Sequence, residues 1–194
     1  MKKHFKQVAI VLFAIASFSI TSCKKDSPVP ETNQEEFDKT VFTFVELEAH
    51  DDHYHEHDTA LTITFDAKGK PDKSHYHLTA GQKYRLYISL YSKGELINDE
   101  ILEEASIHQF FFTGAPDGVL NYTYEDNVGL KGIFDVQQES TTFPLNVVLR
   151  HGIKKSNPIL AWNTPRSEYA KAGGADDLNV SFDLHPVAGE GHGH

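Results

Sequence analysis

Sulfur is almost absent from this chain of 194 residues, which has one cysteine and one methionine, the initiator. A single cysteine excludes a disulfide scaffold and any zinc or iron–sulfur site built from several cysteines. Basic residues are also few, with 18 Lys and Arg against 28 Asp and Glu and a formal net charge of −10. Phosphate contacts need clustered cations, so we expect no nucleic-acid partner. The 12 histidines are the one excess in the composition.

The only long apolar run, residues 8–20, follows a lysine-rich N-terminus. About thirteen residues are too few for a membrane-spanning helix of ~20 residues, but they suit a signal peptide. The run ends in Ile20-Thr21-Ser22-Cys23, which resembles a bacterial lipobox, in which the cysteine is lipidated and becomes the first mature residue. We therefore expect residues 1–22 to be a lipoprotein signal peptide and Cys23 to anchor the protein to a membrane through acyl chains such as palmitate.

The remaining chain divides into three parts by composition. Residues 23–36 are polar, contain two prolines and predict a disordered tether. Residues 37–187 carry a repeating apolar pattern and are expected to form one domain. Residues 188–194 predict a flexible tail that includes His192 and His194.

Apolar and polar side chains alternate with a period of two along the domain, which is typical of β-strands. Strands are expected at residues 41–47, 61–66, 84–90, 109–113, 119–124, 143–149 and 178–184. Asn98 is expected to cap a short helix that reaches about Ala105, and Thr164-Pro165 to begin another that stops at Gly173. The predicted fold class is all-β: an immunoglobulin-like or Greek-key sandwich of about 7–9 strands with one or two short helical turns.

Several stretches resemble small lipoproteins of the Bacteroidota that are found beside TonB-dependent outer-membrane receptors. The matching segments are residues 22–26 (SCKKD), 78–84 (LTAGQKY), 98–104 (NDEILEE) running into 108–112 (HQFFF), 145–151 (LNVVLRH) and 175–182 (ADDLNVSF). The resemblance covers most of residues 38–185. It implies a β-sandwich at the outer membrane with no known enzymatic activity, and it makes a TonB-dependent receptor a candidate partner. This chain departs from the group where histidines replace an acidic, glycine-rich loop and plain strands.

The densest histidine cluster lies between the first two expected strands, in a hairpin loop or a strand extension. It contains His50, His53, His55 and His57, interspersed with Asp52, Glu56 and Asp58. In extended backbone the side chains at i and i+2 share a face, so His53, His55 and His57 are expected to project together. Imidazole binds Zn²⁺, Cu²⁺, Ni²⁺ and Co²⁺, and nearby carboxylates bind the metal or orient the rings. The alternative is a solvated polar loop with incidental histidines.

A second cluster, His75-Tyr76-His77, places two histidines on one strand face. The two clusters could form one site or two, and the sequence leaves this open. The single histidines lie at the ends of expected strands, and we assign them structural roles. His108 precedes an aromatic run, His151 has the parity of a buried face, and His185 is expected to be exposed.

These features predict an outer-membrane lipoprotein, on the periplasmic or the cell-surface side, that captures a transition metal for a receptor-linked uptake system. The expected ligands are His50, His53, His55, His57, His75 and His77. Zn²⁺ is the first choice, with Cu²⁺, Ni²⁺ and Co²⁺ as alternatives. No enzyme is expected, since neither a nucleophile elbow nor an HExxH helix is present. Two other functions stay open: a haem-binding lipoprotein with two axial histidines, and a structural or adhesive surface protein.

Overall fold

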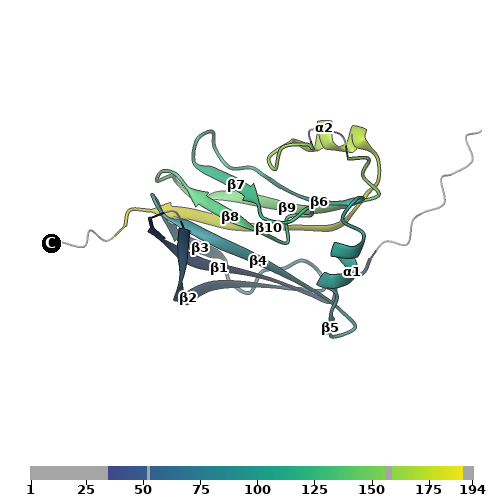
Figure 1. Cartoon of the computed structure of the whole chain (residues 1–194), viewed down its shortest axis with the longest axis horizontal. Helices are drawn as coiled ribbons and strands as arrows, with labels where there is room; N and C mark the ends of the chain where they lie inside the picture. Colours follow the sequence, from purple (N-terminus) through teal and green to yellow (C-terminus); the bar gives the residue numbers. More distant parts are fainter. Residues whose placement is uncertain (1–34, 52, 156–158, 190–194) are drawn as a thin grey trace, which may run out of the picture. The chain divides into compact units, whose positions relative to one another are not determined.

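Two β-sheets packed face to face make up the domain (Figure 1). The computed structural model describes residues 35–51, 53–155 and 159–189. Strands account for 55% of the structure and helices for 9%, so the prediction of an all-β sandwich is confirmed. The expected signal peptide, Cys23, most of the tether, Asp52, His192 and His194 lie outside the described residues. No helix in the described ranges combines the length and apolar character needed to cross a membrane.

The first sheet has the strand order β2-β1-β4-β8-β7, with β5 paired to β4. Its strands are β1 (Lys39–His50), β2 (His53–Asp66), β4 (Lys83–Ser92), β5 (Glu95–Leu96), β7 (Leu120–Tyr124) and β8 (Lys131–Val136). The second sheet has the order β3-β10-β9-β6. Its strands are β3 (His75–Thr79), β6 (His108–Thr113), β9 (Phe143–His151) and β10 (Ala175–Val187). All pairs are antiparallel except β3 and β10, which run parallel.

Aromatic side chains from both sheets meet in the core. Phe42 of β1 packs edge-to-face on Phe65 of β2, with ring centroids 5.0 Å apart, and reaches Phe182 of the opposite sheet at 6.2 Å. All three rings are buried, and each contributes roughly 1.5–3 kcal/mol through burial. The alternation seen in the sequence therefore corresponds to real inward and outward faces.

The aromatic run of β6 is buried on both faces, as the sequence predicts. Phe110 and Phe112 belong to the main core, whereas Phe111 points to the other side of its sheet. There it stacks on Tyr169 with ring centroids 4.6 Å apart. Tyr169 ends α2 (Arg166–Tyr169), which continues into the 3-10 helix η1 (Ala170–Ala172). This segment covers the outer face of the second sheet (Figure 1).

Two features of the fold differ from expectation. Strand β8 falls where no strand was expected, because Gly132 interrupts its pattern; a Cβ there would lie 2.5 Å from the Tyr122 ring. The helix α1 (Asn98–Glu103) is present, but Asn98 does not cap it, since the N-cap is Ile97 and no side chain bonds to the cap. The Asn98 amide instead donates to the Ile88 carbonyl (2.7 Å) and accepts from the Leu90 amide (2.8 Å). Asn98 thus attaches α1 to β4.

Candidate metal-binding sites

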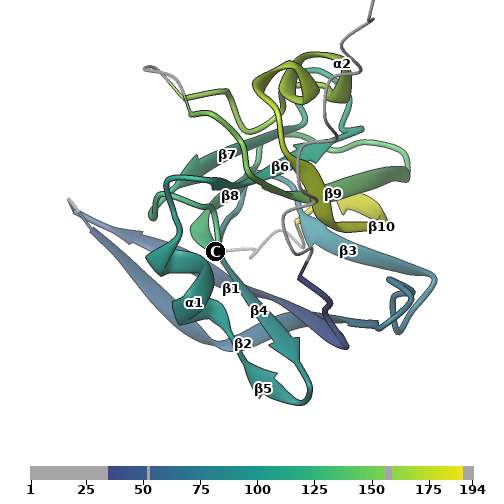
Figure 2. The ribbon, with the colours of Figure 1, turned by 90° about the vertical axis from the view of Figure 1, so that its right-hand side faces the viewer.

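The histidine-rich segment is an extension of strands β1 and β2 rather than a loop. The two strands pair from Lys39↔Asp66 out to His50↔His53, beyond the part of β1 that pairs with β4. Only Asp51 and Asp52 connect them, and Asp51 has a φ of 49°, the left-handed conformation that two-residue hairpin turns favour. Figure 2 shows the two strands running together past the rest of the sheet.

Three imidazole rings gather on one face of this extension. His50, His53 and His55, here named the hairpin histidines, share a face because His50 pairs with His53 and His55 lies two residues further on. The Nε2 atoms of His53 and His55 are 3.0 Å apart, and the His50 ring centroid lies 5.3 Å from that of His55. Ligand nitrogens around a tetrahedral zinc ion are about 3.3 Å apart, given Zn–N bonds of ~2.0–2.1 Å. The His53–His55 nitrogen pair is therefore close to the spacing of two zinc ligands, and the His50 ring lies beside it.

A carboxylate completes this face. Glu48 lies opposite His55 in the register and thus on the side of the hairpin histidines. The pairing of β1 with β2 shifts between Val45 and Leu47, and this irregularity removes His57 from the simple i, i+2 series. His57 nevertheless approaches Glu48, with 3.8 Å between His57 Nε2 and the Glu48 carboxylate. The candidate ligands on this face therefore come from both strands, and not from one alternating run.

Glu56 has a different role from the metal-ligand or ring-orienting role expected for it. It points to the opposite face of the hairpin, where its carboxylate accepts hydrogen bonds from Arg85 Nη1 and Tyr87 Oη, each 2.6 Å long. Arg85 also donates to both carboxylate oxygens of Glu125. The Tyr87 hydrogen bond, followed by that from Arg85, lowers the pKa of Glu56 below 4.5. Glu56 therefore attaches the hairpin extension to β4.

A second histidine group lies on the outer face of the other sheet. In β3, Tyr76 and Leu78 point into the core, so His75 and His77 point outward and are exposed. His185 of β10 pairs in register with His77, and their ring centroids are 5.1 Å apart. His75 follows at 5.0 Å from His77. These three, here named the sheet-face histidines, form a row, and His185 is half-buried rather than exposed as expected.

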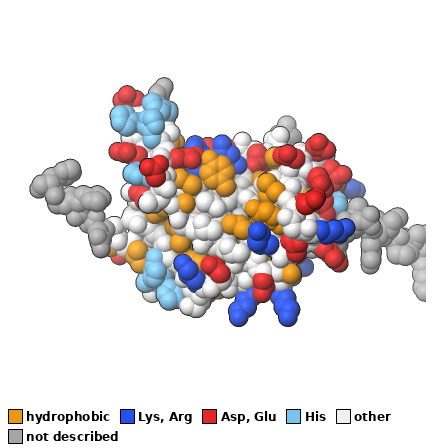
Figure 3. Space-filling model, turned by 90° about the horizontal axis from the view of Figure 1, so that it is seen from below, with side chains coloured by type: hydrophobic (Ala, Val, Ile, Leu, Met, Phe, Trp, Pro, Cys, Tyr) orange, Lys and Arg blue, Asp and Glu red, His pale blue; other side chains and the backbone are white. Residues whose placement is uncertain are grey.

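The two exposed groups belong to different sheets. Within the described residues, ring contacts connect histidines inside each group, and none connects one group to the other. In Figure 3 the hairpin end projects from the body of the domain, and its histidine side chains are separate from a second patch on the body. This arrangement supports two sites rather than one.

A third group, which the sequence did not suggest as a ligand set, is buried at the edge of the sandwich. His108 begins β6 and His151 ends β9; they are paired in register with ring centroids 4.6 Å apart. Both are buried, at 0% and 8% exposure. The exposed Glu104, just after α1, has a carboxylate within 4.8 Å of a ring nitrogen of each. Among the described residues, these three form the group of histidine and acidic side chains whose ligand atoms all lie within 4.8 Å of one another.

A β-bulge brings Asp177 to this buried pair. Asp176 pairs with Arg150 and Leu178 with Leu149, which leaves Asp177 as the extra residue of β10. Its side chain is fully buried, and one oxygen lies 3.1 Å from His151 Nδ1 and 3.9 Å from His108 Nε2. Bulges commonly redirect a side chain in this way. One carboxylate oxygen of Asp177 thus lies close to a ring nitrogen of both histidines.

The protonation of this buried group follows from its surroundings. Burial lowers the pKa of His108, so its ring is neutral near pH 7. Burial raises the pKa of Asp177, and the neighbouring His151 opposes that rise. His108 Nε2 and Asp177 Oδ1 are buried without a hydrogen-bond partner. A buried polar atom left unsatisfied costs about 1–3 kcal/mol, so both atoms need an explanation.

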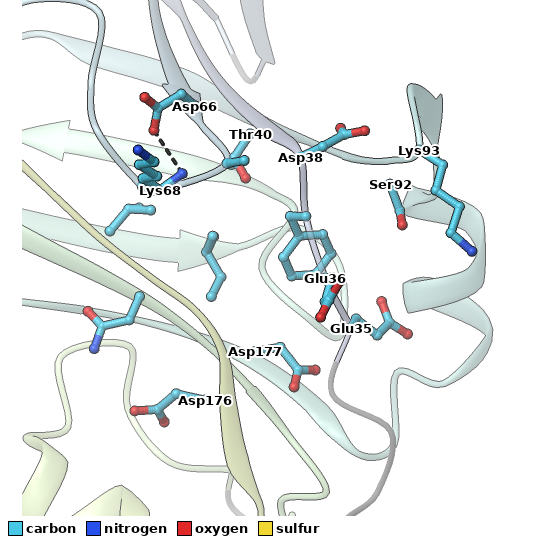
Figure 4. Close-up of a pocket in the computed structure, with 16 residues that line it drawn as sticks. Glu35, Glu36, Asp38, Thr40, Asp66, Lys68, Ser92, Lys93, Asp176 and Asp177 are labelled. Atoms are coloured by element: carbon cyan, nitrogen blue, oxygen red, sulfur yellow. Dashed lines mark hydrogen bonds between the residues drawn. The ribbon is translucent and has the colours of Figure 1, made fainter.

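An acidic pocket of about 640 Å³ lies beside Asp177. Its carboxylates come from Glu35, Glu36, Asp38, Asp66, Asp176 and Asp177, and its ammonium groups from Lys68 and Lys93 (Figure 4). Burial, reinforced by the charge of Asp177, raises the pKa of Glu35. Asp176 is neutralised by Arg150 at 2.6 Å and by Arg166 at 3.0 Å. The pocket therefore has an excess of negative charge that favours cations.

No protein-family model, curated protein or solved structure matches this chain.

The structure thus adds Glu48 and the buried carboxylates as candidate ligands or neighbours, and it places His108, His151 and His185, to which the sequence gave structural roles, in histidine groups. Glu48 and His185 are supplied by neighbouring strands, and their proximity depends on register. Two signals for the buried group are present in the sequence: the histidines at strand ends and the adjacent Asp176-Asp177. Neither reveals that the ends of β6, β9 and β10 meet at one point.

Proposed function

We propose that this protein is a lipid-anchored outer-membrane lipoprotein that binds a transition metal, Zn²⁺ first, through the hairpin histidines. It serves as a capture component of a receptor-linked metal uptake system. The observation that carries the proposal is the cross-strand face of the hairpin, where the Nε2 atoms of His53 and His55 lie 3.0 Å apart and His50 is adjacent.

Three properties of the hairpin support metal capture. Its rings are exposed, so an ion reaches them from solvent. Glu48 supplies a negative charge on the same face, whereas Arg85 lies on the opposite face, where it pairs with Glu56. The strands hold the rings together before binding, which reduces the conformational entropy lost when the metal is bound. The sheet-face histidines offer a second, weaker set in a row.

Calorimetric titration of the full-length protein with Zn²⁺ tests the proposal. Replacing His50, His53 and His55 together by Ala is expected to lower zinc affinity at least about tenfold, because a polydentate site fails when its ligands are removed. The matched control replaces His192 and His194, two histidines outside the hairpin, and is expected to change affinity by less than about twofold. Equal affinity for the parent and the hairpin variant would overturn the proposal.

The same protein samples distinguish the alternatives. An absorbance scan with added haemin that shows a Soret shift, without heat from Zn²⁺, favours a haem-binding lipoprotein. If neither ligand binds, the histidines are incidental and the structural or adhesive function becomes the better one.

A further inference from the structure

We infer that the buried group forms a separate site for one divalent transition-metal ion, with Glu104, His108 and His151 as its ligands. This inference is independent of the hairpin, since it uses other residues at another part of the fold. Two imidazoles and one carboxylate are a ligand set that zinc and ferrous iron share, and three protein ligands leave a fourth position open.

The hydrogen bonds of the two rings support this assignment. His108 Nδ1 lies 3.1 Å from the backbone carbonyl of Glu104, and His151 Nδ1 lies 3.1 Å from the Asp177 carboxylate. When each Nδ1–H donates to these oxygens, both Nε2 atoms are left as acceptors. Histidines that bind metals almost always have this arrangement, in which a carbonyl or carboxylate fixes the tautomer and the other nitrogen holds the ion.

A second and independent observation comes from the polar atoms without partners. His108 is 0% exposed and its Nε2 has no hydrogen-bond partner; the nearest charged group to it is the Asp177 carboxylate at 3.9 Å, and one of the His108 ring nitrogens lies within 4.8 Å of a ligand atom of both Glu104 and His151. Buried polar atoms are nearly always satisfied, so this nitrogen is expected to have a ligand. A bound cation supplies one without displacing any existing contact.

The charge balance also suits a divalent ion. The carboxylates of Asp177 and Glu104 offset a 2+ ion, and the backbone amide of Glu35 bonds to the Asp177 carboxylate. Lys155 is a nearby positive charge that would repel a cation. Its ammonium group donates hydrogen bonds to the carbonyl oxygens of Ala105 and Asn127, which hold it in place. Asp177 also lines the acidic pocket, whose negative charge raises the local cation concentration.

Near the buried site, the backbone before β10 lies in close contact with the backbone at the end of β9. Gly174 has a φ of 76°, and a Cβ there would lie 1.9 Å from the His151 carbonyl oxygen. Arg150 then holds the carbonyls of Gly173 and Gly174, at 2.9 and 2.6 Å, and the Asp176 carboxylate at 2.6 Å. These contacts fix the start of β10 and therefore the bulge that presents Asp177.

The test uses a full-length background variant in which the hairpin and sheet-face histidines are replaced by Ala. Titration with Co²⁺ alone, followed by its visible d–d absorption, is expected to show one bound ion. In this background Glu104→Gln is expected to weaken binding at least about tenfold. Glu103→Gln removes an equal charge from the adjacent exposed residue of α1 and is expected to change binding by less than about twofold.

The outcomes separate this inference from the proposed function. Loss of all Co²⁺ binding up to about 1 mM, in a background whose circular dichroism matches the parent, overturns the buried site and leaves the hairpin site intact. Equal affinities for Glu104→Gln and Glu103→Gln overturn it as well. If the background variant does not fold, Glu104→Gln is made in the parent chain, where one equivalent of bound metal must be lost and must remain with Glu103→Gln.

Discussion

The hairpin site depends on a contact on its opposite face, and Glu56→Ala tests that dependence. The substitution removes two 2.6 Å hydrogen bonds, from Arg85 and Tyr87, that attach the extension to β4. Charged hydrogen bonds are worth about 1.5–3 kcal/mol in protected sites, but exposed ion pairs only about 0.2–1 kcal/mol. The Glu56 side chain is 36% exposed and Arg85 keeps its pairing with Glu125, so we expect a loss of about 1 kcal/mol.

This loss is expected to appear in two measurements. Amide hydrogens of the hairpin extension should exchange faster, because strands without the anchor separate more often. Zinc affinity should fall by up to about fivefold, the factor equivalent to 1 kcal/mol, since the metal must now pay to order the hairpin. Hydrogen exchange followed by mass spectrometry and calorimetric titration with Zn²⁺ are the assays.

The control is Asp58→Ala, which removes the same charge from the same hairpin. Asp58 is exposed and has no hydrogen-bond or ion-pair partner among the described residues. It is expected to leave amide exchange unchanged and to alter zinc affinity only through charge. If both variants lose affinity equally, the effect is electrostatic and the anchoring role of Glu56 is refuted. The same result follows if exchange in the extension does not change with Glu56→Ala.

Three further predictions address anchoring, protonation and fold. Cys23→Ala should release the protein from membranes in a carbonate wash followed by immunoblotting, because the lipid is expected to be its only anchor. Zinc affinity measured by calorimetry should fall as pH drops from about 7.5 to about 5.5, since histidine binds metal as neutral imidazole and titrates near pH 6.5 when unperturbed. Gly174→Ala should lower the free energy of unfolding in urea by about 3 kcal/mol, because its Cβ would meet a carbonyl oxygen at 1.9 Å. Gly81→Ala, with nothing within 4 Å of its Cβ, should cost only about 1 kcal/mol of backbone strain.

Each of these has an outcome that contradicts it. Retention of the Cys23 variant on washed membranes argues against the lipoprotein assignment. Zinc binding that does not change over this pH range argues against histidine ligands. Equal stability losses for Gly174→Ala and Gly81→Ala would mean that the start of β10 is not held as tightly as the structure indicates.

The stabilisation of the hairpin by Glu56 is expected to depend on pH, and the lowered pKa of Glu56 gives the direction. The pKa of Glu56 is lowered in the folded protein, so its contribution to stability is present above about pH 4.5. It is lost as the pH falls through the lower, folded value. Protection of the hairpin amides, which is their exchange rate relative to the intrinsic rate at the same pH, is therefore expected to fall only in acid below about pH 4.5, and protection that is already lost at pH 6 would contradict the assignment.

Local pattern was sufficient for much of the fold. The alternation at residues 143–149 and 178–184 predicted β9 and β10, because the two-residue period of a strand is a local property of the sequence. The second half of β9 is nevertheless buried on both faces, since Val148 packs against Phe111 and Tyr169. The sequence predicted for the same reason that His53 and His55 share one face and that His75 and His77 share another, since i, i+2 spacing specifies a shared face. Asn98 shows the limit of local reasoning. Asparagine is a common helix N-cap, but here the side chain bonds to the backbone of β4 and does not cap α1.

Which histidines and acidic residues become neighbours was decided by strand pairing and by the crossing of the chain between the two sheets. Residue spacing carries no information about which strands become neighbours, so the sequence alone could not place His185 beside His77 or His151 beside His108. The same holds for Asp177, whose position depends on a single extra residue in the β9–β10 pairing. The sequence by itself determined the strand character, the histidine-rich hairpin and the acidic balance, which are local or additive properties. Only the tertiary structure decided which candidate ligands meet, because that depends on register between segments far apart in the chain.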